Sequence, residues 1–166
     1  MTAEQKFVHG QGFYDSNADA CGVRYPALMF QPRAILVLVL VARLFATGWV
    51  FVGLAALLAW CALVPQLNPF DAIYYHLVTK RSQEPRVPPA PAPRRFTQSL
   101  GSAMLLAVGI LMIKGRDLAA WRLFGLTVLM MSVLVFGRFC MGSFLYFIFT
   151  GQLQRANRML PWSKSA

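Results

Sequence analysis

Cys140 and Ser143 are three residues apart, so a helix through Phe136–Phe149 would place both side chains on one face, with Arg138 close by. A guanidinium beside a thiol favours the thiolate, which is the nucleophile in cysteine chemistry. The stretch contains no histidine or carboxylate that could act as a general base. Two interpretations of Cys140 therefore stay open: a reactive thiol, and a small apolar packing residue, which the missing base favours.

His76 is the single candidate for holding a cofactor. A histidine near a membrane can ligate a haem iron or a chlorophyll magnesium. A bis-histidine haem would need a second histidine within the membrane, and the only other one, His9, lies near the N-terminus. Beside Tyr74 and Tyr75, His76 is better explained as a polar group in the headgroup region. We therefore expect no intrinsic cofactor and no metal site, with lipid or pigment contacts left open.

Acidic residues are scarce in the apolar part of the chain. Beyond the N-terminal tail the acids are Asp71, Glu84 and Asp117, and none lies in the middle of an apolar segment. An ion-coupled transporter usually needs a carboxylate or similar polar group within the membrane. The three cysteines have no CxxC or metal-ligand spacing, and no nucleotide-binding or triad motif occurs. We predict that the protein is not an enzyme and has no catalytic residues.

Two apolar blocks, Ala34–Val64 and Ser99–Phe149, must position these residues. The content of 57% hydrophobic residues is too high for a soluble domain of this length. Between the blocks lies KRSQEPRVPPAPAPRR, residues 80–95, whose prolines and charges favour an extended, water-exposed connector. The sequence therefore predicts two membrane-embedded halves joined outside the bilayer.

The first block is too long for one straight crossing. Ala34–Val64 would make a helix of about 46 Å, against a hydrocarbon thickness of about 30 Å. Thr47-Gly48 offers a break, so we expect a hairpin, and Lys114–Asp117 should be the turn of a second one. The fold class is therefore an all-α polytopic membrane bundle, with four transmembrane helices in two hairpins and short interfacial helices. The expected membrane helices are 27–46, 49–64, 96–113 and 118–135.

Amphipathicity and charge indicate the roles of the remaining segments. Pro65–Leu77 is amphipathic and predicts a short interfacial helix, whereas Phe136–Phe149 either extends the fourth helix or folds along the interface. In the third helix, Gly101 and Gly109 should face neighbouring helices, because small residues allow close approach in lipid. The resulting regions are an N-terminal tail (1–26), a first hairpin with its interfacial helix (27–78), a connector (79–95), a second hairpin (96–150) and a basic C-terminal tail (151–166).

Charge predicts the orientation of the bundle. The formal net charge is +10, and most basic residues lie in the tails and the connector. Such a distribution marks the cytoplasmic side and attracts anionic lipid headgroups, so it does not indicate nucleic-acid binding. We expect a multi-pass protein of the bacterial inner membrane with both termini in the cytoplasm.

Two stretches, VPPAPAPRRFTQS (87–99) and FGRFCMGSFLY (136–146), resemble a family of small four-helix bacterial membrane proteins catalogued as a domain of unknown function. The pattern is a Pro-rich connector ending in a basic pair and Phe-x-Gln, then a Phe-x-x-Cys-x-Gly-type element. The resemblance spans about Cys21 to Tyr146 and implies four membrane helices. Members often carry two cysteines three apart, whereas here Cys140 is followed by Ser143.

The preferred functional hypothesis is a non-catalytic accessory or assembly subunit of a larger membrane complex, of the respiratory or photosynthetic electron-transport type. Its aromatic side chains suit contacts with other membrane subunits, with lipids or with pigments. Phe70, Tyr74, Arg94 and Arg95 are the residues expected to meet partners or headgroups. The alternatives are a membrane protein that handles thiols or sulfur compounds through Cys140, and a small transporter.

Overall fold

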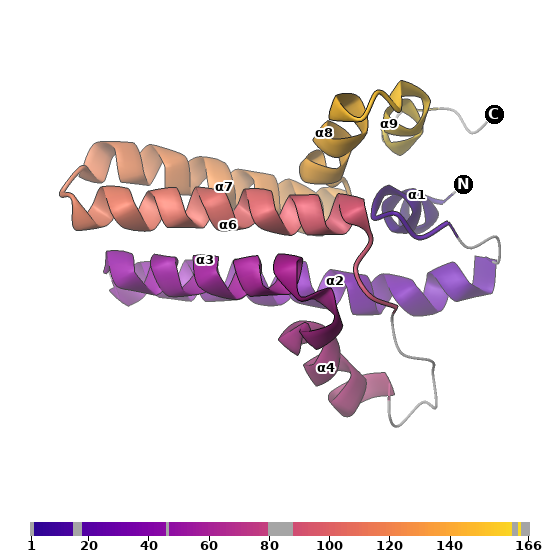
Figure 1. The fold of residues 1–166 in the computed structure, drawn as a ribbon, viewed down its shortest axis with the longest axis horizontal. Helices are drawn as coiled ribbons and strands as arrows, with labels where there is room; N and C mark the ends of the chain where they lie inside the picture. Colours follow the sequence, from indigo (N-terminus) through magenta and orange to yellow (C-terminus); the bar gives the residue numbers. More distant parts are fainter. Residues whose placement is uncertain (1, 15–17, 46, 80–87, 161–162, 164–166) are drawn as a thin grey trace.

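The computed structural model describes residues 2–14, 18–45, 47–79, 88–160 and 163, and all its regular elements are helices. Four long helices run side by side: α2 (Ala18–Phe45), α3 (Gly48–Leu63), α6 (Ala92–Ile113) and α7 (Asp117–Gly137). The α2–α3 and α6–α7 turns lie at one end of this bundle, and both termini lie at the other (Figure 1). The expected all-α bundle is confirmed.

The length and composition of these helices make the chain a multi-pass membrane protein. Arg24–Phe45, α6 and α7 are each long and apolar enough to cross a bilayer. A fourth span exists if α3 is joined to the following segment Pro65–Val78, from which it is bent by 119°. The break expected at Thr47-Gly48 is present, since Thr47 has an extended backbone and α3 begins at Gly48.

Close contact between α3 and α6 organises the bundle. These two helices pack more extensively than any other pair. A Cβ atom on Gly109 would lie 2.8 Å from the carbonyl oxygen of Gly48, so both glycines permit the approach of the two backbones. The main core, which includes Phe51 and Leu105, surrounds this contact. The hairpin partners α2 and α3 touch much less, so each hairpin is stabilised chiefly by the other one.

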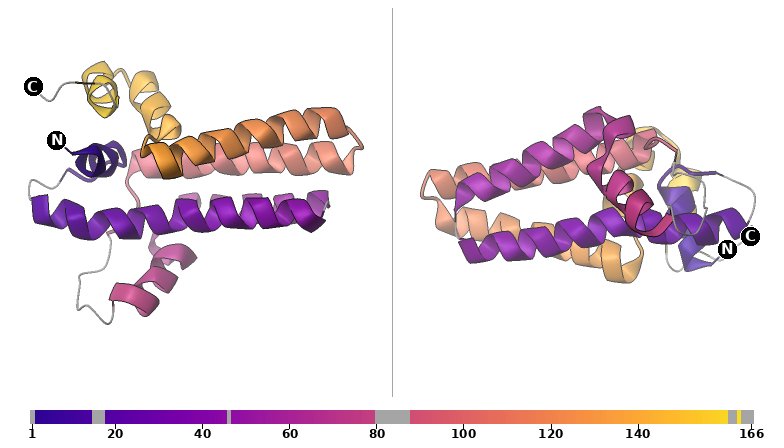
Figure 2. Two further views of the ribbon diagram at one scale, coloured as in Figure 1. Left: turned by 180° about the vertical axis from the view of Figure 1, so that it is seen from behind. Right: turned by 90° about the horizontal axis from the view of Figure 1, so that it is seen from below.

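Short helices lie at the end of the bundle that carries the termini. Asn68 caps α4 (Pro69–Tyr74) by accepting from the Phe70 N–H at 3.0 Å, and this helix continues into η2 (Tyr75–Thr79) after η1 (Pro65–Leu67). The three segments replace the single interfacial helix expected over Pro65–Leu77. They lie on one side of the bundle, opposite α8 and α9 (Figure 2).

The chain breaks after α7 instead of continuing it. Arg138 has a left-handed backbone with φ of 54°, which ends α7 at Gly137. After this break α8 (Met141–Phe149) turns away from α7 and is followed by α9 (Leu153–Met159) (Figure 1). The alternative in which 136–149 extends the fourth helix is therefore wrong, and folding of this segment along the interface stays a prediction.

The two terminal regions are more ordered than their description as tails implied. Thr2 and Gln5 form a capping box at the start of α1 (Ala3–Gly10), and Phe7 is buried against α2. The Lys6 ammonium donates to the carbonyl oxygens of Leu160 and Ser163 at 3.3 and 2.8 Å. The buried hydrophobic side chains and the hydrogen bonds of Lys6 to the C-terminal segment explain why both terminal regions are folded. The connector also ends early, because α6 starts at Ala92, and residues 80–87 lie outside the described part.

Candidate functional site

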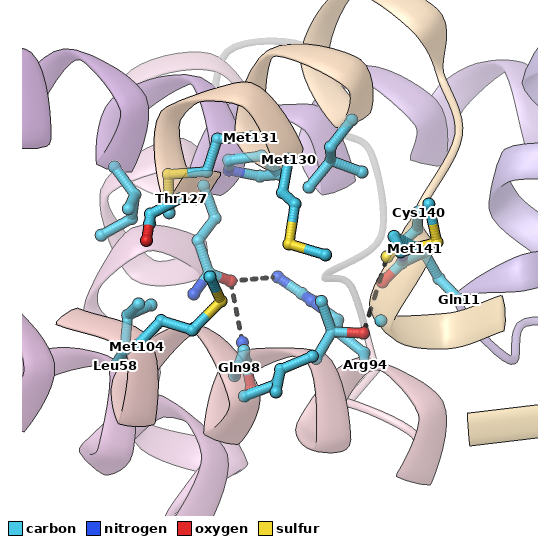
Figure 3. A pocket seen from close by; sticks show the side chains of 18 of the residues that line it. Gln11, Leu58, Arg94, Gln98, Met104, Thr127, Met130, Met131, Cys140 and Met141 are labelled. Carbon is cyan, nitrogen blue, oxygen red and sulfur yellow. Dashed lines mark hydrogen bonds between the residues drawn. The ribbon is translucent and has the colours of Figure 1, made fainter. Parts of the chain in front are cut away.

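A cavity of about 110 Å³ lies inside the bundle, at the level of the N-terminal half of α6. Its walls come from α2, α3, α6, α7 and α8, together with Gln11 at the end of α1 (Figure 3). One buried water molecule needs roughly 10–15 Å³ of such a cavity. The space is therefore large enough for a ring-sized group.

The Gln31 amide oxygen is the centre of the polar end of this cavity. It accepts from Arg94 Nη2 and Gln98 Nε2, both at 2.9 Å, and from Asn68 Nδ2 at 3.2 Å. Figure 3 shows the hydrogen bonds from Arg94 and Gln98. The Gln31 oxygen therefore faces three donors, and its own NH₂ group points elsewhere. Three helices, α2, α6 and the start of α4, are joined by this one acceptor.

Arg94 carries the charge of the polar end, and Asp71 balances it. The two side chains form an ion pair with 2.8 Å between Nη2 and Oδ1, and their side chains are 4% and 19% exposed. Such a pair offsets the desolvation of the guanidinium only because further hydrogen bonds support it. The net charge at this end of the cavity is therefore zero.

Three buried atoms here have no hydrogen-bond partner within the described part of the protein. They are Gln31 Nε2, Arg94 Nη1 and Gln98 Oε1, two donors and one acceptor. All three side chains line the cavity and are at most 6% exposed. Leaving a buried polar group unpaired costs about 1–3 kcal/mol, and more for a charged one. Three such atoms around one cavity indicate a place for a complementary polar group.

A thiol and two hydroxyls form a second polar group at the cavity wall beside α8. Cys140 is the N-cap residue of α8 and is 2% exposed. The Ser143 hydroxyl donates to its sulfur at 3.3 Å, and Thr97 Oγ1 lies 3.5 Å from that sulfur. Gln11 donates to Ser143 at 3.4 Å. Gly142 keeps α8 close to α6, because a Cβ atom there would meet the Thr97 side chain at 2.8 Å.

The rest of the lining is apolar. Leu58, Met104, Met130 and Met131 line the inner part (Figure 3). The Thr127 hydroxyl donates to the Leu123 carbonyl oxygen of its own helix at 2.8 Å. The polar and apolar parts follow each other along α6. Arg94 and Gln98 precede Met104, which lies about 15 Å further along the helix than Arg94 at the α-helical rise.

The pair Cys140 and Ser143 is the part of the predicted site that the structure brings together. Both line or border the cavity and contact each other. Arg138, expected to act on the thiol, instead makes an ion pair with Glu4 at 3.6 Å, and its guanidinium lies 5.4 Å from the ring centroid of Tyr25. His76 is exposed in η2, where its ring contacts Tyr75 at 5.6 Å, and it is not among the residues that line the cavity.

The residues expected to meet partners or headgroups fall into two groups. Phe70 and Arg94 are 6% and 3% exposed, which corrects their placement on an outer surface. Phe70 packs into the main core, and Arg94 turns inward because Asp71 and Gln31 bind it. Tyr74 is half-buried with its ring against Phe30, and Arg95 is exposed and donates to the Ala62 carbonyl at 2.8 Å.

Sequence reasoning missed Gln31, Gln98 and Asn68. One signal was available: Arg94 and Gln98 are four residues apart, so they share a face of α6, and Gln31 interrupts an otherwise apolar stretch of α2. Among the described residues, no group of three histidine, cysteine, aspartate or glutamate side chains could hold a metal ion.

The fold and this cavity define a helical multi-pass membrane protein with a polar site buried inside its bundle. A comparison with known protein families shows which of its helices belong to a family domain. The chain belongs to the family described as a domain of unknown function (DUF4395), whose model matches residues 23–150. The match runs from α2 through α8, so it includes the whole polar end, whereas α1 and α9 lie outside it. No curated protein and no solved structure shows significant similarity to the chain.

Proposed function

We propose that this protein binds a small amphiphilic molecule within its membrane-embedded bundle. The observation that supports this most is the set of three unpartnered polar atoms, on Gln31, Arg94 and Gln98, at one end of a cavity whose inner part is apolar. A ligand with a polar head and an apolar body would pair these atoms and fill the space beyond them.

The position of the cavity supports an amphiphile in particular. The polar end lies near the start of α6, which is the end of the bundle that carries the termini (Figure 1). The apolar part continues toward the middle of α6 and α7, where the helices are surrounded by hydrocarbon. A lipid-like molecule has the same order of polar and apolar groups across one leaflet of a bilayer.

Filling the cavity tests this function. Gly101 lines the cavity, and a Cβ atom there would make only an ordinary contact of 3.4 Å with Leu58, so Gly101→Leu would occupy space that the ligand needs. Gly125→Leu is the matched control, since no atom lies within 4 Å of a Cβ atom at that position. Protein purified in mild detergent is analysed by native mass spectrometry, and the small molecules that it releases are identified.

The expected result is a bound small molecule on the parent protein and on Gly125→Leu, reduced at least about tenfold on Gly101→Leu, which corresponds to about 1.4 kcal/mol. Equal retention by both variants would mean that the molecule binds elsewhere on the surface. A parent protein that releases no such molecule, and takes none up when lipid extract is added, would refute the proposal.

The accessory-subunit hypothesis is compatible with ligand binding but needs separate support. Large apolar side chains on α2, α3 and α7, such as Leu44, Trp49 and Leu129, are exposed, and lipid or a partner helix would cover them equally well. Handling of thiols is supported by the position of Cys140 at the cavity wall. If Cys140→Ala abolishes the host membrane's activity while binding persists, that second function gains support.

We also propose that both termini face the cytoplasm. The two turns, around Thr47 and Gly115, lie at the end of the bundle opposite to the termini (Figure 1). The termini, connector and flanks carry most of the basic residues. With Lys114→Cys and Asn157→Cys variants, an impermeant thiol reagent applied to intact cells should label only position 114. Labelling of position 157 alone would reverse the orientation, and labelling of both would contradict the two-hairpin arrangement.

A further inference from the structure

We infer that the head of the ligand is the oxygen-bearing ring of a quinol, with the corresponding quinone as the weaker-binding form. This inference rests on the proposed function, because it identifies the chemical class that the same cavity would accept. It is argued from the three unpartnered atoms, from the charge of the polar end and from the composition of the walls.

The charge balance favours an uncharged head. Arg94 is already neutralised by Asp71 at 2.8 Å, so an added carboxylate or phosphate would leave a net negative charge in a buried site. An added cation would meet the guanidinium. A neutral polar group avoids both costs, which argues against a fatty-acid anion or a phospholipid headgroup as the occupant.

The hydrogen-bonding pattern favours a hydroxyl group. Gln31 Nε2 and Arg94 Nη1 are donors, and Gln98 Oε1 is an acceptor. The orientation of both amides is fixed by Arg94: its guanidinium can only donate, so the Gln31 atom 2.9 Å from it is the oxygen, and the Gln98 atom 2.9 Å from that oxygen is then the NH₂ nitrogen. A hydroxyl has two acceptor lone pairs and one donor hydrogen, so it matches these unpartnered atoms in number and kind. A quinone carbonyl can only accept, and it would leave Gln98 Oε1 unpaired.

The walls favour a flat ring over a simple alkyl alcohol. Met104, Met130 and Met131 line the inner part of the cavity, beyond Gln98 along α6 (Figure 3). Thioether sulfurs make favourable contacts with aromatic rings, and flexible methionine side chains adapt to the ring's shape. A quinol combines such a ring with a hydroxyl and an apolar tail that follows the inner part of the cavity.

The test compares two oxidation states of one probe. Binding of a decyl-substituted benzoquinol and of its benzoquinone is measured under anaerobic conditions, with the full-length protein in lipid nanodiscs and empty nanodiscs as background. Decylbenzene serves as the purely apolar probe and decanoate as the anionic one. The parent protein should bind the quinol at least about fivefold more tightly than the quinone, since an unpaired buried acceptor costs about 1 kcal/mol or more.

Gln98→Met identifies the residue responsible. It removes the acceptor while keeping a side chain of similar size, so the ratio of quinol to quinone affinity should fall to about 1. Gln66→Met is the matched control, because Gln66 is exposed in η1 and should leave the ratio unchanged. The ratio is taken within each variant, so a general loss of folded protein does not alter it. The parent ratio tests the inference even if Gln98→Met does not fold.

The other outcomes separate the inference from the function on which it rests. Equal affinity of the parent for quinol and quinone, or tighter binding of decanoate, would overturn the quinol assignment, while saturable binding of decylbenzene would leave the proposed function intact. If no probe binds above empty nanodiscs, the cavity holds water only and both proposals are wrong.

Discussion

Gly109 offers a direct test of the helix packing, because its surroundings predict the sign of a single added methyl group. A Cβ atom at this position would lie 2.8 Å from the Gly48 carbonyl oxygen and 3.1 Å from the Val52 backbone nitrogen. Two of the nearest atoms belong to the backbone of α3, so they cannot move aside as the end of a flexible side chain could. Gly109→Ala must therefore separate α3 from α6, and overpacking of this kind costs about 1–3 kcal/mol.

Two other glycines supply the reference for this prediction. Alanine favours a helix over glycine by up to about 1 kcal/mol, and Gly125→Ala measures that gain alone because the position has open space around it. Gly101→Ala should behave similarly, since its Cβ atom would make an ordinary contact at 3.4 Å. The expected order of stability is Gly125→Ala, Gly101→Ala, the parent and then Gly109→Ala.

Reversible denaturation of the three variants in mixed micelles, followed by helical circular dichroism, would measure these differences. Gly109→Ala should be about 1–3 kcal/mol less stable than Gly125→Ala, which cancels the propensity gain common to both. If Gly109→Ala is as stable as Gly125→Ala, α3 and α6 are not in backbone contact, and the packing described for the bundle is wrong.

Three further predictions concern the polar end and its cover. Asp71→Ala should cost about 3–5 kcal/mol in the same denaturation assay because it leaves Arg94 buried without its counter-charge, and the loss should shrink when Arg94→Met is added. Burial lowers the pKa of His9 below its usual 6.5, so the folded state favours the neutral ring. The contribution of His9 to α1 docking is therefore complete above pH 6.5 and falls as the pH drops further. Limited proteolysis should show this pH dependence in the parent protein and not in His9→Gln. Deleting residues 2–14 should speed alkylation of Cys140, in a background without the other two cysteines, since α1 covers that thiol; an unchanged rate would show that α1 does not shield it.

The bundle could be predicted from the sequence because its signals are local. Runs of apolar residues, Thr47-Gly48 and Lys114–Asp117 report directly on which segments are helical and where they turn. The polar end could not be predicted from the sequence, because its residues come from three separate segments, α2, the start of α4 and α6. Gln31 gains its meaning only when Arg94 and Gln98 lie beside it, and no pattern within one helix reveals that neighbour.

Arg94 shows most clearly why the site could not be predicted from the sequence. In the sequence it belongs to a basic pair at the end of a proline-rich stretch, which is typical of a water-exposed flank. α6 begins at Ala92, four residues earlier than the expected start at 96, so both arginines lie within the helix and point in different directions: Arg94 into the bundle and Arg95 toward its exterior. A shift of a helix start by a few residues therefore decided which of two adjacent arginines could take part in the site.

The contact between α1 and α9 sets an order for biosynthesis. Lys6 leaves the ribosome well before Leu160 and Ser163, whose carbonyl groups it binds, because they follow it by 154 and 157 residues in the chain. Until α9 has been made, α1 can dock only on the helices already present, chiefly α2, and the cover over the cavity is completed after α9 has been released. The cavity is therefore more accessible in the nascent protein than in the finished one, so a ligand can enter before its cover closes.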